Sequence, residues 1–323
     1  MSADIVDFAE YRGGTPTAIE IGAPLPEVTA VSPVRYEAIG RMGVTLTDSV
    51  RLNTGLTYKR RLYTPADPRY ETPVTMDTPW GTDLDGIDDD VARLLMAAGV
   101  TVASIEAPTV QLADVSHLTG LVSLADDARA HHAILNDYQE RYGVSTRRII
   151  NYGFSRGAMV GLAVTSTAVD YERQVDYFEY VDPTVEHQLS DTDRQPSDVL
   201  NYLGHEAMAL LFSGLTEHGA SRVAHALWSS RHLLQHAAVG FSIFRGDTGD
   251  FARQVPPSAT GHITFFDHSR WNHAADYQRD LMGCSGIGFD TIDGYHTLSN
   301  RPAVWKASVQ RILAHQARLA FVS

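Results

Sequence analysis

The sequence contains very little cysteine. Cys284 is the one cysteine among 323 residues, so the chain cannot form an internal disulfide. A chain of this length with 44% hydrophobic residues can bury a sizeable core without covalent cross-links. The composition therefore excludes a small domain held together by disulfides, and it fits a reducing compartment.

Positive charge and long apolar runs are also scarce. The chain has 26 Lys and Arg against 39 Asp and Glu, a formal net charge of −13, whereas nucleic-acid and anionic-lipid surfaces need clustered basic residues. We therefore expect a small-molecule or acyl substrate as the partner. No stretch approaches the ~18 apolar residues of a membrane span, and the first residues, MSADIVDFAEYRGG, lack the apolar segment of a secretory signal. These features predict a cytoplasmic protein, while the oligomeric state stays open.

Strand and helix patterns alternate along the first half of the chain. Runs rich in Val, Leu, Thr and Tyr at 43–50 and 56–63 flank a turn at 53–55, which predicts a hairpin. Short apolar runs predict strands at 72–76, 100–105 and 148–152, and helical periodicity predicts helices at 88–98 and 124–142 between them. Such alternation is typical of a mostly parallel sheet with helices on both faces, an α/β fold.

The second half interrupts this alternation and then resumes it. After a helix at 156–168 and a strand at 177–181, two apolar helical segments at 197–215 and 220–239 fall within an insertion. Strands at 263–266 and 287–292 and helices near 272–282 and at 302–320 follow. We therefore expect an extended N-terminal arm at 1–42, a core of 43–183 and 258–323, and a helical cap at 184–257.

The most informative motif is Gly-x-Ser-x-Gly at 153–157, which lies directly between a predicted strand and a predicted helix. A serine at the apex of such a sharp turn exposes its hydroxyl, and the flanking glycines let the backbones approach closely. The turn also places Ser155 at a helix N-terminus, where the N–H of Arg156 faces a developing oxyanion. The pattern indicates a nucleophilic serine.

With this motif, the element order and a late histidine, the chain resembles the α/β-hydrolase superfamily over about residues 43–320. The resemblance implies a mostly parallel eight-stranded sheet, a cap inserted after the sixth strand, and a serine–acid–histidine triad in that chain order. It also implies that a second oxyanion donor follows the strand at 72–76. Pro79 has no N–H, so Trp80 is the candidate donor, although it could equally form a wall of the pocket.

The resemblance places the base in the loop after the last strand, where His296 lies. A serine hydroxyl is too weak an acid to ionise without such a base. The pair His232 and His236 has the spacing of metal ligands, but no further ligand completes the set, so we expect neither a metal nor a cofactor.

Two aspartates compete for the role of triad acid, which orients the imidazole and stabilises its cation. Asp267 ends the strand before the usual acid loop, but that loop lacks the superfamily's Gly-x-x-Asp pattern. Asp182 ends the preceding strand, where some lipase-like and dehalogenase-like members carry their acid. Both stay open, with a small preference for Asp182.

We therefore expect a serine hydrolase that cleaves an ester or related acyl bond through an acyl-enzyme. The apolar helices of the expected cap favour a substrate with an apolar acyl or aromatic group. The alternatives are a thioesterase, peptidase or lactonase on the same fold, or a non-catalytic binding protein.

Overall fold

The computed structural model describes residues 23–78, 84, 87–106, 124–183, 248–268, 274–294 and 302–322. The strands are β1 Val28–Val31, β2 Arg35–Ile39, β3 Gly43–Leu52, β4 Thr57–Pro65, β5 Val74–Asp77, β6 Val102–Ile105, β7 Arg148–Phe154, β8 Gln174–Val181, β9 Thr260–Phe266 and β10 Gly286–Ile292. The helices are α1 Ile87–Ala97, α2 Leu124–Tyr142, α3 Arg156–Thr167, the 3₁₀ helix η3 Ala168–Tyr171, α7 Thr248–Gln254, α8 Ala274–Asp280 and α9 Pro302–Val322.

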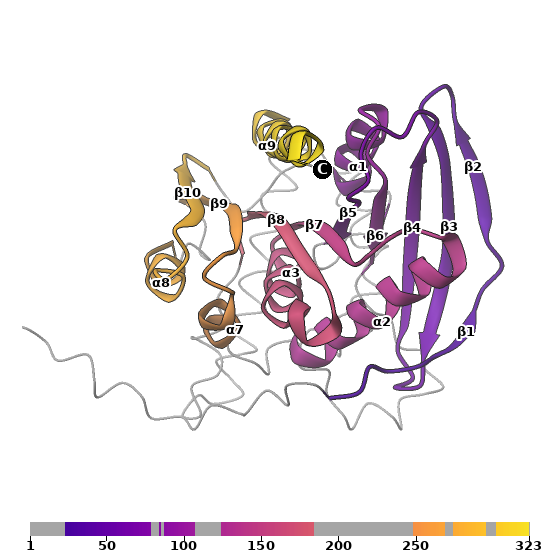
Figure 1. The fold of residues 1–323 in the computed structure, drawn as a ribbon, viewed down its shortest axis with the longest axis horizontal. Helices are drawn as coiled ribbons and strands as arrows, with labels where there is room; N and C mark the ends of the chain where they lie inside the picture. The colour runs from indigo at the N-terminus through magenta and orange to yellow at the C-terminus, as the bar shows by residue number, and fades with distance from the viewer. Residues whose placement is uncertain are drawn as a thin grey trace, which may run out of the picture.

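These elements form a mixed sheet whose main path runs β1-β3-β4-β6-β5-β7-β8-β9-β10, with β2 paired to β3 (Figure 1). The strands β6, β5, β7, β8, β9 and β10 are parallel to one another, whereas β4 is antiparallel to both of its neighbours, β3 and β6. The predicted α/β fold with a mostly parallel sheet is confirmed. In such a sheet, side chains that follow the carboxyl ends of the strands gather at one edge.

Within the described ranges the sheet has ten strands, rather than the eight that the resemblance implies. The additional strands, β1 and β2, lie in the segment expected to be an extended arm, and both pair antiparallel with β3. Four of the five residues of β2 are exposed, so this strand lacks the alternation of apolar and polar residues that identifies a half-buried strand. Its pairing with β3 has no local signal in the sequence.

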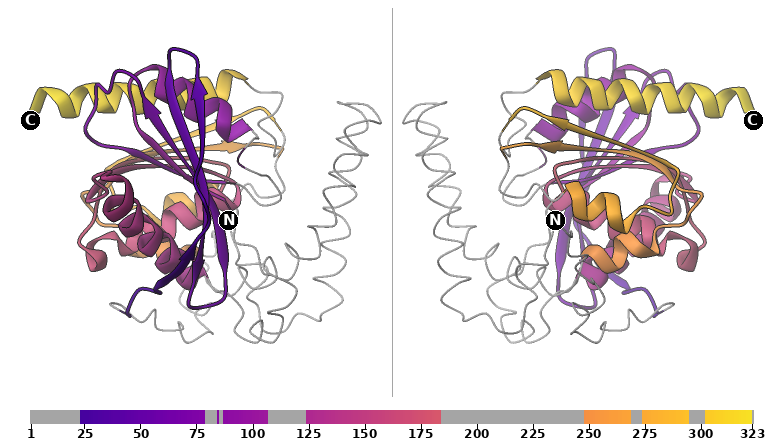
Figure 2. Two further views of the ribbon diagram at one scale, coloured as in Figure 1. Left: turned by 90° about the vertical axis from the view of Figure 1, so that its right-hand side faces the viewer. Right: turned by 90° about the vertical axis from the view of Figure 1, so that its left-hand side faces the viewer.

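Helices cover both faces of the sheet (Figure 2). Figure 2 shows α9 lying along one face, while α2, α3, α7 and α8 lie on the opposite face. One hydrophobic cluster packs α1 and α9 against the central strands, with Leu95, Val102, Ile150 and Ile312 all buried. Another packs α2, α3 and α7 on the other face, and it includes Ile134, Met159 and Phe251. Within the described residues, no helix is long and apolar enough to cross a membrane.

The expected cap lies almost entirely outside the described residues, which resume at 248. Its last part, 248–257, contains α7, where Phe251 and Ala252 are buried. Ala252 and Val255 join a cluster with Leu162 of α3, so this end of the expected insertion packs into the body.

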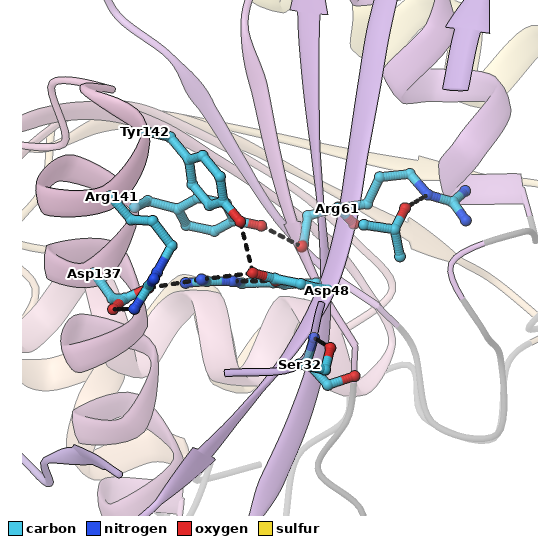
Figure 3. Close-up of polar contacts among 11 residues, drawn as sticks. Ser32, Asp48, Arg61, Asp137, Arg141 and Tyr142 are labelled. Carbon is cyan, nitrogen blue, oxygen red and sulfur yellow. Dashed lines mark hydrogen bonds and ion pairs between the residues drawn. The ribbon is translucent and has the colours of Figure 1, made fainter. Parts of the chain in front are cut away.

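A buried cluster of charges joins α2 to the β3–β4 hairpin (Figure 3). The guanidinium of Arg60 lies 2.6 Å from Asp48 Oδ1 and 2.6 Å from Asp137 Oδ2, and the Tyr142 hydroxyl donates a 2.6 Å hydrogen bond to Asp48. Arg141 also pairs with Asp137 at 3.3 Å. These contacts fix the position of α2, the helix that carries two charged residues of the candidate site.

Candidate active site

Ser155 occupies a strained turn between β7 and α3. Its backbone has φ 54° and ψ −124°, a conformation that costs a residue other than glycine roughly 1–3 kcal/mol. The Ser155 N–H donates to the carbonyl of Val181 at the end of β8, and the Ser155 carbonyl accepts the N–H of Ala158 in the first turn of α3, both at 3.0 Å. The side chain is neither fully buried nor fully exposed. The surroundings thus impose the strained turn from both sides.

The two glycines of the motif are required by close backbone packing. A Cβ atom on Gly153 would lie 2.4 Å from the carbonyl group of Gly157, and a Cβ on Gly157 would lie 2.0 Å from the carbonyl oxygen of Asp77. Real Cβ atoms do not approach backbone atoms this closely. The close packing of β7, α3 and the end of β5 around Ser155 therefore explains both glycines of the Gly-x-Ser-x-Gly pattern.

Arg156 follows Ser155, and its side chain lies in a buried ionic cluster. The guanidinium forms an ion pair with Asp127 of α2, which also accepts a 2.9 Å hydrogen bond from the Tyr58 hydroxyl. Asp127 is fully buried and Arg156 is 4% exposed. Because breaking a buried ion pair is strongly destabilising, this contact holds the first turn of α3 against α2.

His131 extends the same cluster to the end of β5. Its Nε2 lies 2.7 Å from Asp77 Oδ1, and its Nδ1 lies 2.7 Å from the backbone carbonyl of Asp127. A carbonyl oxygen only accepts hydrogen bonds, so Nδ1 carries a proton, and Nε2 faces a carboxylate that also favours a proton. Burial lowers the pKa of His131, but the charges of Asp77 and Asp127 outweigh it and raise that pKa above its ordinary value.

The cluster therefore contains two carboxylates and two cations with almost no exposure to water. It joins three separate elements around the serine turn: the end of β5, the first half of α2 and the start of α3. Asp77, Asp127 and His131 were not among the site residues predicted from the sequence. The one signal for them is the spacing of four between Asp127 and His131, which places both on one side of a helix.

Asp182 follows β8 directly and lies in the strand-end region next to Ser155. It is fully buried and has a positive φ of 44°. Its backbone N–H donates to Thr264 at 2.7 Å, and its Oδ1 accepts the N–H of Phe266 at 3.3 Å. The carboxylate is therefore held between the ends of β8 and β9, one residue beyond the carbonyl that binds Ser155 N–H.

Asp267 follows β9 and has a different environment. Its side chain is 43% exposed, and its Oδ1 accepts a 2.9 Å hydrogen bond from the N–H of Gly294. This bond lowers the pKa of the Asp267 carboxyl group. Two backbone hydrogen bonds, from Asp267 to Ile292 and from His268 to Gly294, join the same loops. Asp267 thus anchors the chain that leads from β10 towards position 296.

Three exposed side chains beside this anchor have the composition of a cation site. Asp267, His268 and Asp293 place one ligand atom each within 4.8 Å of one another. His268 Nε2 lies 3.3 Å from Asp293 Oδ1, so the group is also explained as an ordinary surface contact between an imidazole and a carboxylate.

The remaining predicted site residues, His296 and Trp80, lie outside the described residues. Of the six predicted positions, the structure brings together Ser155, Arg156 and Asp182 at the adjacent ends of β7 and β8. It places Asp267 one strand further along, at the end of β9. The pair His232 and His236, for which we expect no metal, also lies outside the described part.

No protein-family model matches the chain, and no curated protein matches it with significance. Solved structures do match. The α/β hydrolase GrgF from Penicillium sp. sh18 has a TM-score of 0.58 and 14% identity, over 85% of this chain and 98% of its own. A hydrolase from Pseudomonas aeruginosa has a TM-score of 0.57 and 14% identity, over 87% and 98%.

An acetyl xylan esterase from Paenibacillus sp. R4 also matches, with a TM-score of 0.54 and 12% identity over 92% of this chain and 91% of its own. Such identities are too low to transfer an activity or a substrate, but the coverage extends over nearly the whole of each chain. Together with the strand order and the strained serine turn, they show that this chain has the fold of the α/β-hydrolase superfamily.

Proposed function

We propose that the chain is a serine hydrolase that cleaves an ester or related acyl bond through an acyl-enzyme on Ser155. The Ser155 oxygen attacks the carbonyl carbon while its proton passes to His296. The bond to the leaving oxygen breaks as His296 returns that proton to it. Water then attacks the acyl-enzyme by the same route in reverse, which releases the acid and regenerates the serine.

One observation carries this proposal: the backbone of Ser155 at φ 54°, held by the close packing of Gly153 and Gly157. A strained conformation of a residue other than glycine persists only where the surroundings impose it, and such positions cluster at active sites. A serine that served only as a turn residue would not need the strain, because glycine would occupy the position without it.

We assign the triad acid to Asp182, in agreement with the preference from the sequence. It is fully buried, and it directly follows Val181, whose carbonyl accepts the Ser155 N–H. Asp267 is more exposed and lies one strand further from Ser155, where it accepts the Gly294 N–H. We therefore assign Asp267 the separate role of anchoring the loop that carries His296.

Oxyanion stabilisation is assigned to two backbone N–H groups. The N–H of Arg156 lies at the start of α3, where the helix dipole adds positive potential. The second donor is Trp80, in the chain that follows Asp77. The ionic cluster of Asp77, His131, Asp127 and Arg156 supports this assignment, because it ties the segment before Trp80 to the residue that supplies the first donor.

The substrate is proposed at the level of bond type, with an apolar acyl or aromatic group. The neighbours include an acetyl xylan esterase and the thioesterase domain from the curacin biosynthetic pathway, whose names describe their own activities. A panel of p-nitrophenyl esters of increasing acyl length, acyl thioesters, lactones and aminoacyl amides separates the four reaction classes. We expect ester cleavage to give the highest kcat/KM.

A fluorophosphonate probe tests the nucleophile without knowledge of the substrate. Intact protein mass spectrometry of the full chain is expected to show one adduct, which peptide mapping assigns to Ser155. Ser155→Ala should abolish the adduct, and His296→Ala should slow its formation strongly. A folded wild-type protein that gives no adduct would instead support a non-catalytic binding protein on this fold.

A further inference from the structure

A pocket of about 290 Å³ opens at the end of the sheet opposite Ser155. Ser155 follows the carboxyl end of β7, whereas Arg147 and Arg173 in the pocket lining precede the amino ends of β7 and β8. The side chains that matter for its chemistry are those of Arg147, Arg173, Asn136, Gln139 and Glu172. The pocket is therefore separate from the proposed active site.

Arg173 is the buried cation of this pocket, with 5% of its surface exposed. Its Nε donates to the Thr146 carbonyl at 2.7 Å and its Nη2 donates to Asn136 Oδ1 at 2.8 Å. Its Nη1 lies 2.7 Å from His132 Nδ1, and because a guanidinium only donates, that nitrogen accepts. His132 is therefore neutral, as expected from burial and the nearby Arg173 charge, which lower its pKa.

Because all of these acceptors are uncharged, they accept the hydrogen bonds of Arg173 but do not neutralise its positive charge. Among the described residues, no carboxylate lies within ion-pair distance of its guanidinium, and burial lowers the pKa of Arg173 to about 10. Other buried arginines all have carboxylate partners: Arg60 with Asp48, Arg61 with Asp89, and Arg156 with Asp127. A buried charge without a counter-charge is unfavourable, and Arg173 is the exception within the described structure.

The other polar groups of the pocket are arranged as donors. The side-chain oxygen of Asn136 accepts from Arg173, which leaves its NH₂ group for another partner. The side-chain oxygen of Gln139 faces the Thr146 hydroxyl at 3.5 Å, which likewise leaves its NH₂ group. Arg147 is exposed and forms no ion pair in the described part of the chain. Two guanidinium groups and two amide NH₂ groups thus border one cavity.

We propose that this pocket binds a phosphate group, with Arg147 and Arg173 supplying the charge and Asn136 and Gln139 supplying further hydrogen bonds. A phosphate carries about −1.5 to −2 charge at neutral pH, which matches two guanidinium groups, and the planar fork of the exposed Arg147 suits its oxygens. The carboxylate of Glu172 also lines the pocket, so it opposes the bound anion. Binding is consequently of moderate strength and sensitive to position 172.

Equilibrium binding to the full-length chain tests the site, with ³¹P NMR and thermal unfolding as two readouts. The probes are inorganic phosphate, glycerol phosphate and acetate, each compared with sodium chloride at equal ionic strength. We expect saturable binding of both phosphates and none of acetate in the same concentration range. Tighter binding of glycerol phosphate identifies an organic phosphate as the ligand, and tighter binding of inorganic phosphate identifies the free ion; both support the proposal.

Matched arginine variants distinguish a site from general surface charge. Arg147→Ala should weaken phosphate binding about tenfold or more, as expected for the loss of a charge-assisted contact. Arg148→Ala is the control, because Arg148 is exposed like Arg147 but pairs with Asp176 at 3.0 Å. It should leave the affinity unchanged. Arg173→Lys keeps a positive charge but loses the hydrogen bonds to Thr146 and Asn136 that hold the guanidinium in the pocket, and it should weaken binding as well.

Glu172→Gln tests the site through an increase in affinity. Glu172 is exposed, and the substitution removes a carboxylate that repels the bound phosphate. We expect it to tighten phosphate binding about threefold or more. The proposal is overturned if phosphate shows no saturable effect beyond that of sodium chloride. Equal weakening by Arg147→Ala and Arg148→Ala, equal binding of acetate and phosphate, or unchanged affinity in Glu172→Gln would also overturn it. None of these outcomes bears on labelling of Ser155, which tests the proposed hydrolase separately.

Discussion

The adjacent histidines of α2 are expected to affect stability in opposite directions as the pH changes. His131 is 1% exposed and lies between two carboxylates, which raise its pKa. His132 is fully buried beside the guanidinium of Arg173, and burial together with that charge lowers its pKa. Both titrate at a pKa of about 6.5 in the unfolded chain.

The sign for each histidine follows from proton uptake. His131 stabilises the fold fully below its unfolded pKa, and this contribution is lost as the pH rises through the higher folded pKa. His132 contributes stability above its unfolded pKa, and this is lost as the pH falls towards the lower folded pKa. Within these windows each histidine changes the free energy of unfolding by at most about 1.4 kcal/mol per pH unit.

Substitution to glutamine separates the two contributions. His131→Gln leaves Asp77 and Asp127 with the single cation of Arg156, and breaking such a buried pair costs about 3–5 kcal/mol at neutral or lower pH. His132→Gln keeps a side-chain oxygen that can accept from Arg173, so its cost at neutral pH should be about 1–2 kcal/mol. His131→Gln should therefore be the more destabilising of the two.

Urea unfolding followed by tryptophan fluorescence, at pH values between 5 and 9, measures these effects. Relative to wild type, His131→Gln should flatten the decline of stability on the alkaline side of pH 6.5, and His132→Gln should flatten the decline on the acidic side. If wild type and His131→Gln lose stability in parallel above pH 6.5, the charge state assigned to His131 is wrong.

Three further outcomes are expected. Ser155→Gly should raise the free energy of unfolding by about 1 kcal/mol while it abolishes fluorophosphonate labelling, because glycine adopts φ 54° without strain; a drop in the melting temperature contradicts this. Asp182→Asn should lower kcat about 10⁴-fold in steady-state assays. Asp267→Asn should lower kcat about tenfold or less, because the asparagine oxygen can still accept the Gly294 N–H. The reverse order of the two effects would exchange the two roles. Gly157→Ala should fail to yield folded, labelled protein, since its Cβ would lie 2.0 Å from a backbone oxygen; normal labelling would refute the packing argument.

The serine turn could be predicted from the sequence because its determinants are local. Gly153, Ser155 and Gly157 lie within five residues, between an apolar strand and a helix, and the structure gives each glycine a steric reason. The positions of β3 to β10 also follow from periodicity along the chain. Local patterns thus account for the fold and for the nucleophile turn.

The parts that could not be predicted depend on contacts between distant segments. β1 and β2 lie in a segment with little periodicity, and both pair with the edge of β3. The ionic cluster joins Asp77, Asp127, His131 and Arg156, whose proximity depends on the packing of α2 against the strands. Only Asp127 and His131 lie close together in the sequence, whereas Asp77 and Arg156 are far from both of them.

Asp77 links the two halves of the proposed oxyanion site through two different physical effects. Its backbone oxygen packs so closely on Gly157 that the start of α3 has almost no room to move towards β5. Its carboxylate pairs with the ring of His131, whose Nδ1 donates to the backbone carbonyl of Asp127, and the Asp127 side chain pairs with Arg156. Steric contact prevents the turn from approaching β5 more closely, and the ion pairs prevent it from moving away. A displacement at the end of β5 therefore reaches the N–H of Arg156, the first of the two proposed oxyanion donors.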